Sequence, residues 1–142
     1  MAKVFILNGP NLNRLGEREP DIYGTLTLAE IEQACVSFGS NHNLEVDFRQ
    51  TNSETELVTW LQEAADTDAP VILNPAAFTH YSVAVRDAAA LLKSTLIEVH
   101  ISNPLKREEF RHTSLISGIA KGSITGFGVQ SYLLALQALV AL

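Results

Sequence analysis

The stretch "PVILN" at residues 70–74 is a short, continuously apolar run that ends in an asparagine. Such a run is typical of a strand that is buried on both faces, as in parallel sheets that helices cover. Four other short runs predict strands at 3–8, 44–50, 95–100 and 122–127. The sequence therefore predicts five strands, and the segments between them decide how the strands pair.

Two of the segments between the strands begin with a helix-capping pattern. Thr27 and Ser53 are each followed three residues later by a glutamate, which is the signature of a capping box. Apolar residues recur at helical spacing behind both of them. We expect Gly39 and Asn41 to end the first of these helices, since both residue types are common beyond helix ends.

The remaining segments complete an alternation of strands and helices. Helices are also expected at 79–93 and 129–142, with a helical turn inside the polar connection at 103–112. Strands that alternate with helices imply parallel strands joined by right-handed crossovers. The sequence therefore predicts an α/β fold, a flavodoxin-like three-layer sandwich with a five-stranded parallel sheet in the order 2-1-3-4-5.

Composition narrows the class of protein further. A chain of 142 residues is expected to form a single domain over 1–142. Its net charge of −6 argues against a broad surface for nucleic acid or membrane, and no apolar run reaches the ~20 residues that a membrane helix needs. Cys35 is the only cysteine, which favours a reduced, cytoplasmic compartment, and its helical spacing to Ile31 and Phe38 predicts a core position.

Polar loops follow three of the predicted strands. In open parallel sheets, ligands bind beyond the carboxyl ends of the strands, near the point where the strand order reverses. The loops after the first, third and fourth strands should therefore meet at one edge of the sheet. Their candidate residues are Asn8, Asn11, Asn13, Arg14, Arg18, Tyr23, Asn74, Thr79, His80, His100, Ser102 and Asn103.

Several familiar site signatures are absent from the sequence, namely a GxGxxG or Walker motif, a GxSxG elbow and a zinc-like histidine spacing. We therefore expect no metal. Two other protein classes stay open, a nucleotide or FMN-binding module and a non-catalytic assembly domain with the 129–142 helix as its interface. Single residues also have structural alternatives: the asparagines can fix turns, and Arg107 and Arg111, at i and i+4, can form a solvated, salt-bridged helical turn.

Four longer motifs resemble one enzyme family. They are "NGPNLNRLGEREPDIYG" (8–24), "NPAAFTH" (74–80), "EVHISN" (98–103) and "REEFRH" (107–112), and they resemble the type II 3-dehydroquinate dehydratases over essentially the whole chain. The resemblance implies that 3-dehydroquinate loses water to give 3-dehydroshikimate in the shikimate pathway, through an enolate and without a cofactor. The "PAA" segment after Asn74 has alanine where some members have glycine, which we expect to change the stiffness of the loop slightly.

The resemblance also implies a role for each site residue. Tyr23 is expected to be the base that removes the proton beside the ketone, with Arg18 near its phenol. Asn11 is expected to stabilise the enolate through a water, and His100 to protonate the departing hydroxyl. The residues expected to bind substrate oxygens are Asn74, His80 and Arg111.

Three further residues are implied by the same resemblance. The backbone amides of Ile101 and Ser102 are expected to hold the substrate carboxylate. Asp87 is expected to act across a subunit contact, in a homo-oligomer of twelve chains built from trimers.

The expected chemistry is physically reasonable for these residue types. A tyrosine with its ordinary pKa of ~10 is too weakly acidic to act as a base at neutral pH. A cation at ~4 Å contributes about 4 kcal/mol at an effective dielectric constant of ~20, which is enough to make the phenolate accessible, and Arg18 is the expected cation. Pro20 and the glycines at 16 and 24 flank this pair, so we expect residues 17–24 to form a lid.

The acid has a predicted partner on its own strand. Glu98 lies two residues before His100, so both side chains project from one face of the strand. Glu98 can orient the imidazole and keep it protonated, or it can be an ordinary carboxylate in a buried charge pair. No lysine falls at the carboxyl end of a buried strand, and we therefore expect no Schiff base.

Overall fold

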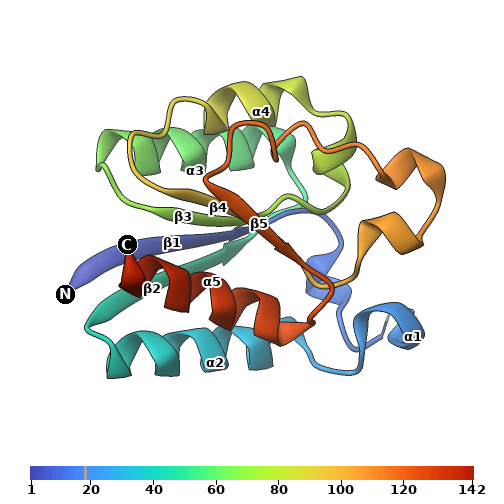
Figure 1. Ribbon diagram of the computed structural model, residues 1–142, viewed down its shortest axis with the longest axis horizontal. Helices are drawn as coiled ribbons and strands as arrows, with labels where there is room; N and C mark the ends of the chain where they lie inside the picture. Colours follow the sequence, from blue (N-terminus) through green and yellow to red (C-terminus); the bar gives the residue numbers. More distant parts are fainter. Residues whose placement is uncertain (18) are drawn as a thin grey trace.

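A parallel five-stranded sheet forms the middle of three layers in the computed structural model, which describes residues 1–17 and 19–142 (Figure 1). The strand order is β2-β1-β3-β4-β5, so the predicted fold class and strand order are confirmed. The strands are β1 (Ala2–Asn8), β2 (Leu44–Gln50), β3 (Val71–Asn74), β4 (Leu96–His100) and β5 (Gly122–Thr125).

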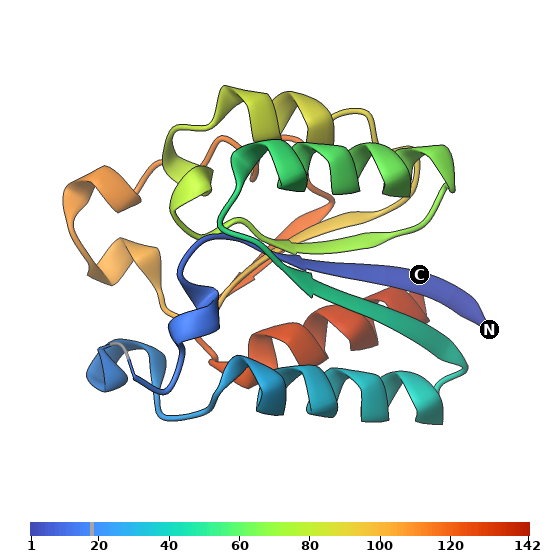
Figure 2. The same ribbon diagram turned by 180° about the vertical axis from the view of Figure 1, so that it is seen from behind.

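Helices cover both faces of this sheet (Figures 1 and 2). One face carries α3 (Glu54–Asp66) and α4 (Val83–Ala89), and the other carries α2 (Leu28–Asn41) and α5 (Val129–Ala141). None of the described helices is long and apolar enough to cross a membrane. The short elements near the carboxyl ends of the strands are α1 (Pro20–Tyr23), η1 (Leu12–Arg14), η2 (Ala76–His80), η3 (Pro104–Lys106) and η4 (Glu109–Arg111).

The core consists of two apolar layers, one on each side of the sheet. Because side chains alternate along a strand, Phe5 of β1 packs into the layer below α3 and α4, while Ile6 packs into the layer above α2 and α5. Cys35 is fully buried in the second layer, which confirms its predicted core position. Burial, with a smaller contribution from the charge of Glu32, raises the pKa of the Cys35 thiol to about 12, so the thiol is not a nucleophile at neutral pH.

The predicted helix starts are correct, but the predicted role of Gly39 is wrong. Thr27 forms the full capping box with Glu30, and the Ser53 hydroxyl accepts a hydrogen bond from the backbone N–H of Glu56. Gly39 does not end α2 but lies inside it, where a Cβ atom would come within 2.7 Å of the carbonyl oxygen of Leu44. Glycine at this position therefore allows the helix and the start of β2 to approach closely.

Two predicted helical segments differ from the structure. Residues 79–93 do not form one helix, because the Ser82 hydroxyl accepts the backbone N–H of Val85 at 3.0 Å and begins the shorter α4 after η2. The polar connection at 103–112 holds two separate 3₁₀ turns. The i,i+4 spacing of Arg107 and Arg111 had suggested a shared helix face, and this prediction is wrong.

A buried hydroxyl ties the central strands to the last helix. Tyr132 of α5 is fully buried, and its hydroxyl donates to Asn8 Oδ1 at 2.7 Å and accepts from Asn74 Nδ2 at 2.8 Å. Asn8 in turn donates to the carbonyl oxygen of Arg49 at 2.9 Å. These contacts fix the carboxyl ends of β1 and β3, which flank the point where the strand order reverses.

Replacing Tyr132 with phenylalanine should destabilise the protein by about 1–3 kcal/mol. The substitution removes the hydrogen-bond partner of two buried atoms, Asn8 Oδ1 and Asn74 Nδ2. Urea unfolding followed by circular dichroism measures this change. Tyr81→Phe is the matched control, since the Tyr81 side chain is 63% exposed and its loss of a hydroxyl should cost little. Equal unfolding midpoints for the two variants would contradict the structural role of the Tyr132 hydroxyl.

Candidate active site

One cavity lies at the carboxyl edge of the sheet, where the three polar loops were expected to meet. Its walls come from the loop after β1, from α1, from the segment after β3 and from the end of β4. Among the lining residues are Asn11, Tyr23, Asn74, His80, His100 and Arg111.

Tyr23 ends α1 and contacts a cation that the sequence did not single out. Its hydroxyl oxygen accepts a hydrogen bond from Arg107 Nη1 at 2.7 Å, and the guanidinium carbon lies 5.1 Å from the centre of the ring. The Arg107 side chain is only 11% exposed, so its expected place in a solvated turn is wrong. Arg18, the cation that the sequence suggested, lies outside the described residues.

Arg107 connects α1 to the loop that follows β4. Besides Tyr23, it donates to the Ser102 hydroxyl at 3.2 Å and lies 3.8 Å from the carboxylate of Glu19. Pro104 occupies the first turn of η3, and Arg107 directly follows this turn, with its guanidinium directed at Tyr23.

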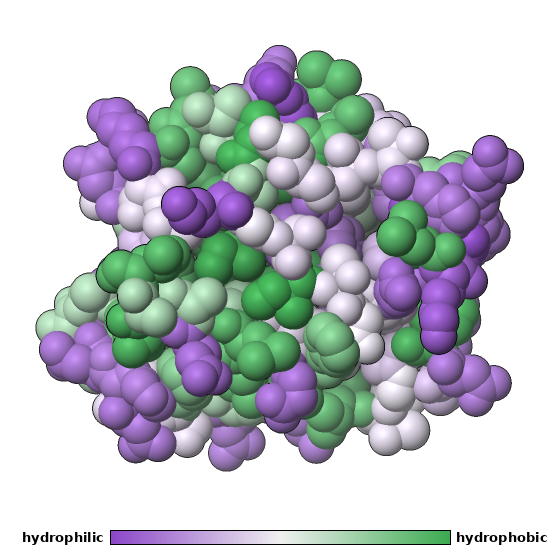
Figure 3. Space-filling model, viewed as in Figure 1, coloured by the Kyte–Doolittle hydropathy of each residue, from purple (hydrophilic) through white to green (hydrophobic). Residues whose placement is uncertain are grey.

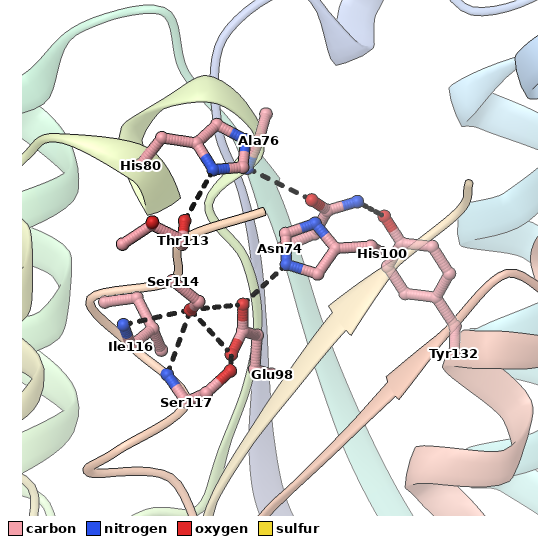
Figure 4. A network of polar contacts seen from close by, with 10 residues as sticks. All are labelled: Asn74, Ala76, His80, Glu98, His100, Thr113, Ser114, Ile116, Ser117 and Tyr132. Carbon is pink, nitrogen blue, oxygen red and sulfur yellow. Dashed lines mark hydrogen bonds and ion pairs between the residues drawn. The ribbon is translucent and has the colours of Figure 1, made fainter. Parts of the chain in front are cut away.

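His100 and Glu98 form a buried pair on β4 (Figure 4). His100 Nε2 lies 2.6 Å from Glu98 Oε2, and only 1% of Glu98 is exposed. Because a carboxylate can only accept hydrogen bonds, Nε2 carries the proton in this contact. This leaves Nδ1 as the ring nitrogen available to a ligand, and it confirms that both side chains project from one face of the strand.

The carboxyl group of Glu98 stays ionised in spite of its burial. Burial is the largest single influence and raises the pKa, but hydrogen bonds from His100, Ser117 and Ser114, together with the charge of His100, outweigh it. The pKa of Glu98 is therefore held below its ordinary value.

His80 is also held by one ring nitrogen, in this case by Nδ1 against a backbone carbonyl. His80 Nδ1 donates to the carbonyl oxygen of Thr113 at 2.8 Å (Figure 4). In the neutral imidazole, Nε2 is then an acceptor, which suits a hydroxyl group of a ligand. His80 and His100 therefore present opposite nitrogens to the site.

The side chain of Asn74 makes two hydrogen bonds within the protein, which the sequence did not predict. Its Oδ1 accepts from the backbone N–H of Ala76 at 3.1 Å, and its Nδ2 donates to Tyr132. One Nδ2 proton remains for a ligand. Ala76 has a φ of +52°, a left-handed conformation that glycine adopts without strain and that is less favourable for alanine.

The other predicted site residues divide into two groups. Asn11, Ile101, Ser102 and Arg111 line the cavity, as expected. Asp87 does not: it lies on α4 with its side chain 64% exposed, 3.1 Å from Arg86. Within this single chain, Asp87 therefore takes no part in the site.

The described residues offer neither a metal centre nor a lysine at the cavity. No group of three or more His, Cys, Asp or Glu side chains among them is arranged to hold a metal ion. No lysine is among the residues that line the cavity. The polar groups available to a ligand are therefore amides, hydroxyls, imidazoles and guanidinium groups.

Comparison with known proteins gives one consistent result. The family model described as "Dehydroquinase class II" matches residues 2–140. The 3-dehydroquinate dehydratase of Salinispora tropica is 56% identical over 139 residues, covering 98% of this chain and 97% of the relative. The 3-dehydroquinate dehydratase of Brucella canis is 53% identical over the same length and share of this chain, and 88% of its own length is covered.

A solved structure supports the same relationship. The crystal structure of type II dehydroquinase from Propionibacterium acnes superposes with a TM-score of 0.97 and is 46% identical in sequence. The match covers 99% of this chain and 97% of that one. The likeness thus extends over the whole sheet, its covering helices and the loops that form the cavity.

The lowered pKa of Glu98 should make its contribution to stability depend on pH. The stabilising effect of a carboxylate with a depressed pKa is fully present above the unfolded value of ~4.3 and is lost as the pH falls through the folded pKa. The difference in unfolding free energy between the native protein and Glu98→Gln should therefore shrink on acidification below about pH 4.3. Urea unfolding at a series of pH values measures this difference, and a gap that widened on acidification would contradict the assignment.

Proposed function

The chain belongs to the class II dehydroquinase family of enzymes, and we propose that it removes water from 3-dehydroquinate to give 3-dehydroshikimate through an enolate intermediate. The observation that carries the proposal is the presence, in one cavity, of a tyrosine hydroxyl held by a cation and a histidine held by an anion. An elimination beside a ketone needs a base and an acid, and these two pairs supply them.

In this proposal Tyr23 is the base. Its phenolate takes the proton from the carbon beside the ketone, and the electron pair of the C–H bond moves into the enolate. The Arg107 guanidinium, 2.7 Å from the phenol oxygen, stabilises the phenolate relative to the phenol. A cation at ~4 Å contributes about 4 kcal/mol at an effective dielectric constant of ~20. Arg18 stays a proposed second cation for the same oxygen.

His100 is the proposed acid. It donates the proton on Nδ1 to the departing hydroxyl, so that the C–O bond breaks and water leaves. Glu98 holds Nε2 and supplies the compensating negative charge while the ring carries both protons. Asn11 is proposed to hold the water that stabilises the enolate oxygen. Because no lysine lines the cavity, the proposal contains no Schiff base.

The substrate is proposed to bind by its oxygen atoms. Its carboxylate would accept the backbone N–H groups of Ile101 and Ser102, which directly follow β4 at the cavity. The acceptor nitrogen of His80 suits a ring hydroxyl, and the remaining N–H of Asn74 and the guanidinium of Arg111 complete the set.

Residues 17–24 are proposed to close over the bound substrate as a lid. Gly16 and Gly24, at its ends, have φ values of +91° and +78°, where residues with a Cβ atom are strained. Closure of such a segment excludes water from the reaction. Arg107 would hold the lid through its contacts to Tyr23 and Glu19.

A homo-oligomer of twelve chains, built from trimers, is also part of the proposal. Apolar side chains gather over α5 on the face in Figure 3, and Leu134, Val140 and Leu142 are more than 40% exposed. Such exposure suits contact with a second copy of the chain. Asp87, exposed on α4, would then act at a neighbouring site.

Mixing the protein with 3-dehydroquinate in EDTA-containing buffer should increase ultraviolet absorbance as the conjugated enone forms. Tyr23→Phe should lower kcat/KM by about 10³-fold, since a general base typically contributes 10²–10⁴. Tyr81→Phe, with an exposed hydroxyl, should keep its activity. A Tyr23→Phe variant with native circular dichroism and unchanged activity would contradict the proposal and favour a binding module or an assembly domain.

Arg107→Leu should lower kcat at neutral pH by about 10²-fold, because the phenolate of Tyr23 loses a charged hydrogen-bond donor. Part of this activity should return at alkaline pH, where the phenol ionises without help from the cation. Arg107→Lys keeps the positive charge but not the planar guanidinium group, so its decrease in kcat should be smaller than that of Arg107→Leu. A uniform loss at every pH, in a folded Arg107→Leu variant, would show that Arg107 serves only to shape the site.

A further inference from the structure

We propose that the turn at residues 113–117 is a positioning element, in which Ser114 and Ser117 clamp Glu98 and so fix the ring of His100. The inference rests on the proposed function only for its effect on the rate. It assigns a role to two serines that are not among the residues lining the cavity, but hydrogen-bond to Glu98, the partner of His100 (Figure 4).

The carboxylate of Glu98 is surrounded by donors. The Ser114 hydroxyl lies 2.9 Å from Oε2 and 3.1 Å from Oε1, and the Ser117 hydroxyl lies 2.5 Å from Oε1. His100 Nε2 provides the third donor at 2.6 Å. The two serines therefore hold both carboxylate oxygens, and the plane of the carboxylate cannot turn without breaking one of these contacts.

The direction of the Ser114 hydroxyl is fixed by its own turn. Its oxygen accepts the backbone N–H groups of Ile116 at 3.1 Å and Ser117 at 3.0 Å. A hydroxyl has one proton and two acceptor sites, so both acceptor sites are used and the proton is left for Glu98. The turn itself therefore directs the Ser114 hydroxyl proton at the Glu98 carboxylate, independently of His100.

The same turn also holds the second histidine of the cavity. The carbonyl oxygen of Thr113 accepts His80 Nδ1, and the backbone N–H of Leu115 donates to the carbonyl oxygen of Thr79 at 2.9 Å. One five-residue segment therefore holds both histidines, and it leaves Nε2 of His80 and Nδ1 of His100 available to the ligand. Since the serines act on His100 alone, His80 is an internal control in the same molecule.

After His100, the two serines contribute to the lowered pKa of the buried Glu98 carboxyl. A protonated Glu98 would be a donor on one oxygen and would lose its strong contact with His100 Nε2. The imidazole could then turn, and the nitrogen facing the departing hydroxyl would no longer be defined. Loss of a clamp should therefore affect the proton transfer, and thus kcat, more than substrate binding.

The test uses full-length protein labelled with ¹⁵N-histidine and ¹³C-glutamate, with NMR titration of the ring and carboxyl signals beside steady-state kinetics. Ser117→Ala should move the titration of the Glu98 carboxyl to higher pH by about one unit and lower kcat about tenfold, since a hydrogen bond to a charged group is lost. The ring signals of His100 should change, and those of His80 should stay as in the native protein.

Two further variants serve as matched controls. Ser117→Thr keeps the hydroxyl, and the Ser117 side chain lines a second pocket beside Glu98, so this variant should restore most of the kcat. Ser123→Ala removes a serine from the lining of the same pocket that, among the described residues, makes no hydrogen bond to Glu98, and it should change neither titration nor rate.

Unchanged Glu98 and His100 titrations in a folded Ser117→Ala variant would overturn the proposal, whatever its activity. Equal shifts at His80 and His100 would also overturn it, because they would show a general distortion of the turn. If Ser114→Ala fails to fold, the NMR titration of Ser117→Ala still tests whether the serines fix Glu98 and His100. The NMR result does not depend on turnover, so an inactive native protein would refute the proposed function and leave the clamp open to the same test.

Discussion

Two hydrogen bonds of the buried Tyr132 hydroxyl fix the sheet at the edge where the cavity lies. They join α5 to the carboxyl ends of β1 and β3, and these two ends flank the point where the strand order reverses. Every segment that lines the cavity leaves the sheet at or next to this point. Because Asn74 is held there by both ends of its amide, the chain after β3 starts from a fixed position and delivers His80 to the site.

A second constraint is the burial of a charge inside the sheet. Glu98 lies in the middle of an apolar strand, where an unpaired carboxylate would be very unfavourable. Its partners come from the same strand and from the turn at 113–117, so the fold must bring that turn back over β4. The polar connection after β4 is therefore more than a link to β5, since it satisfies a group that the strand alone cannot satisfy.

The parts of the structure that follow from local patterns could be predicted from the sequence. Apolar runs such as 70–74 predicted the strands, and their alternation with helices predicted the strand order. The ends of these strands indicated the edge where Tyr23 and His100 line one cavity. The role of Arg107 could not be predicted, because it depends on a contact between residues 84 positions apart. Likewise, the serines that hold Glu98 are 16 and 19 residues away, in a segment without helical or strand periodicity.

In the proposed mechanism, the acid and the base need opposite environments within one small cavity. The cation that stabilises a phenolate would oppose a protonated imidazole, so each group needs its own counter-charge. His100 is fixed on the buried strand with its anion behind it, while Tyr23 lies on α1 with its cation on the loop after β4. Arg107 also contacts Ser102, two residues after His100. The same guanidinium thus links the segment that carries the base to the loop after the strand that carries the acid. In the proposed mechanism, closure of the lid would position Tyr23 and His100 around the substrate at the same time.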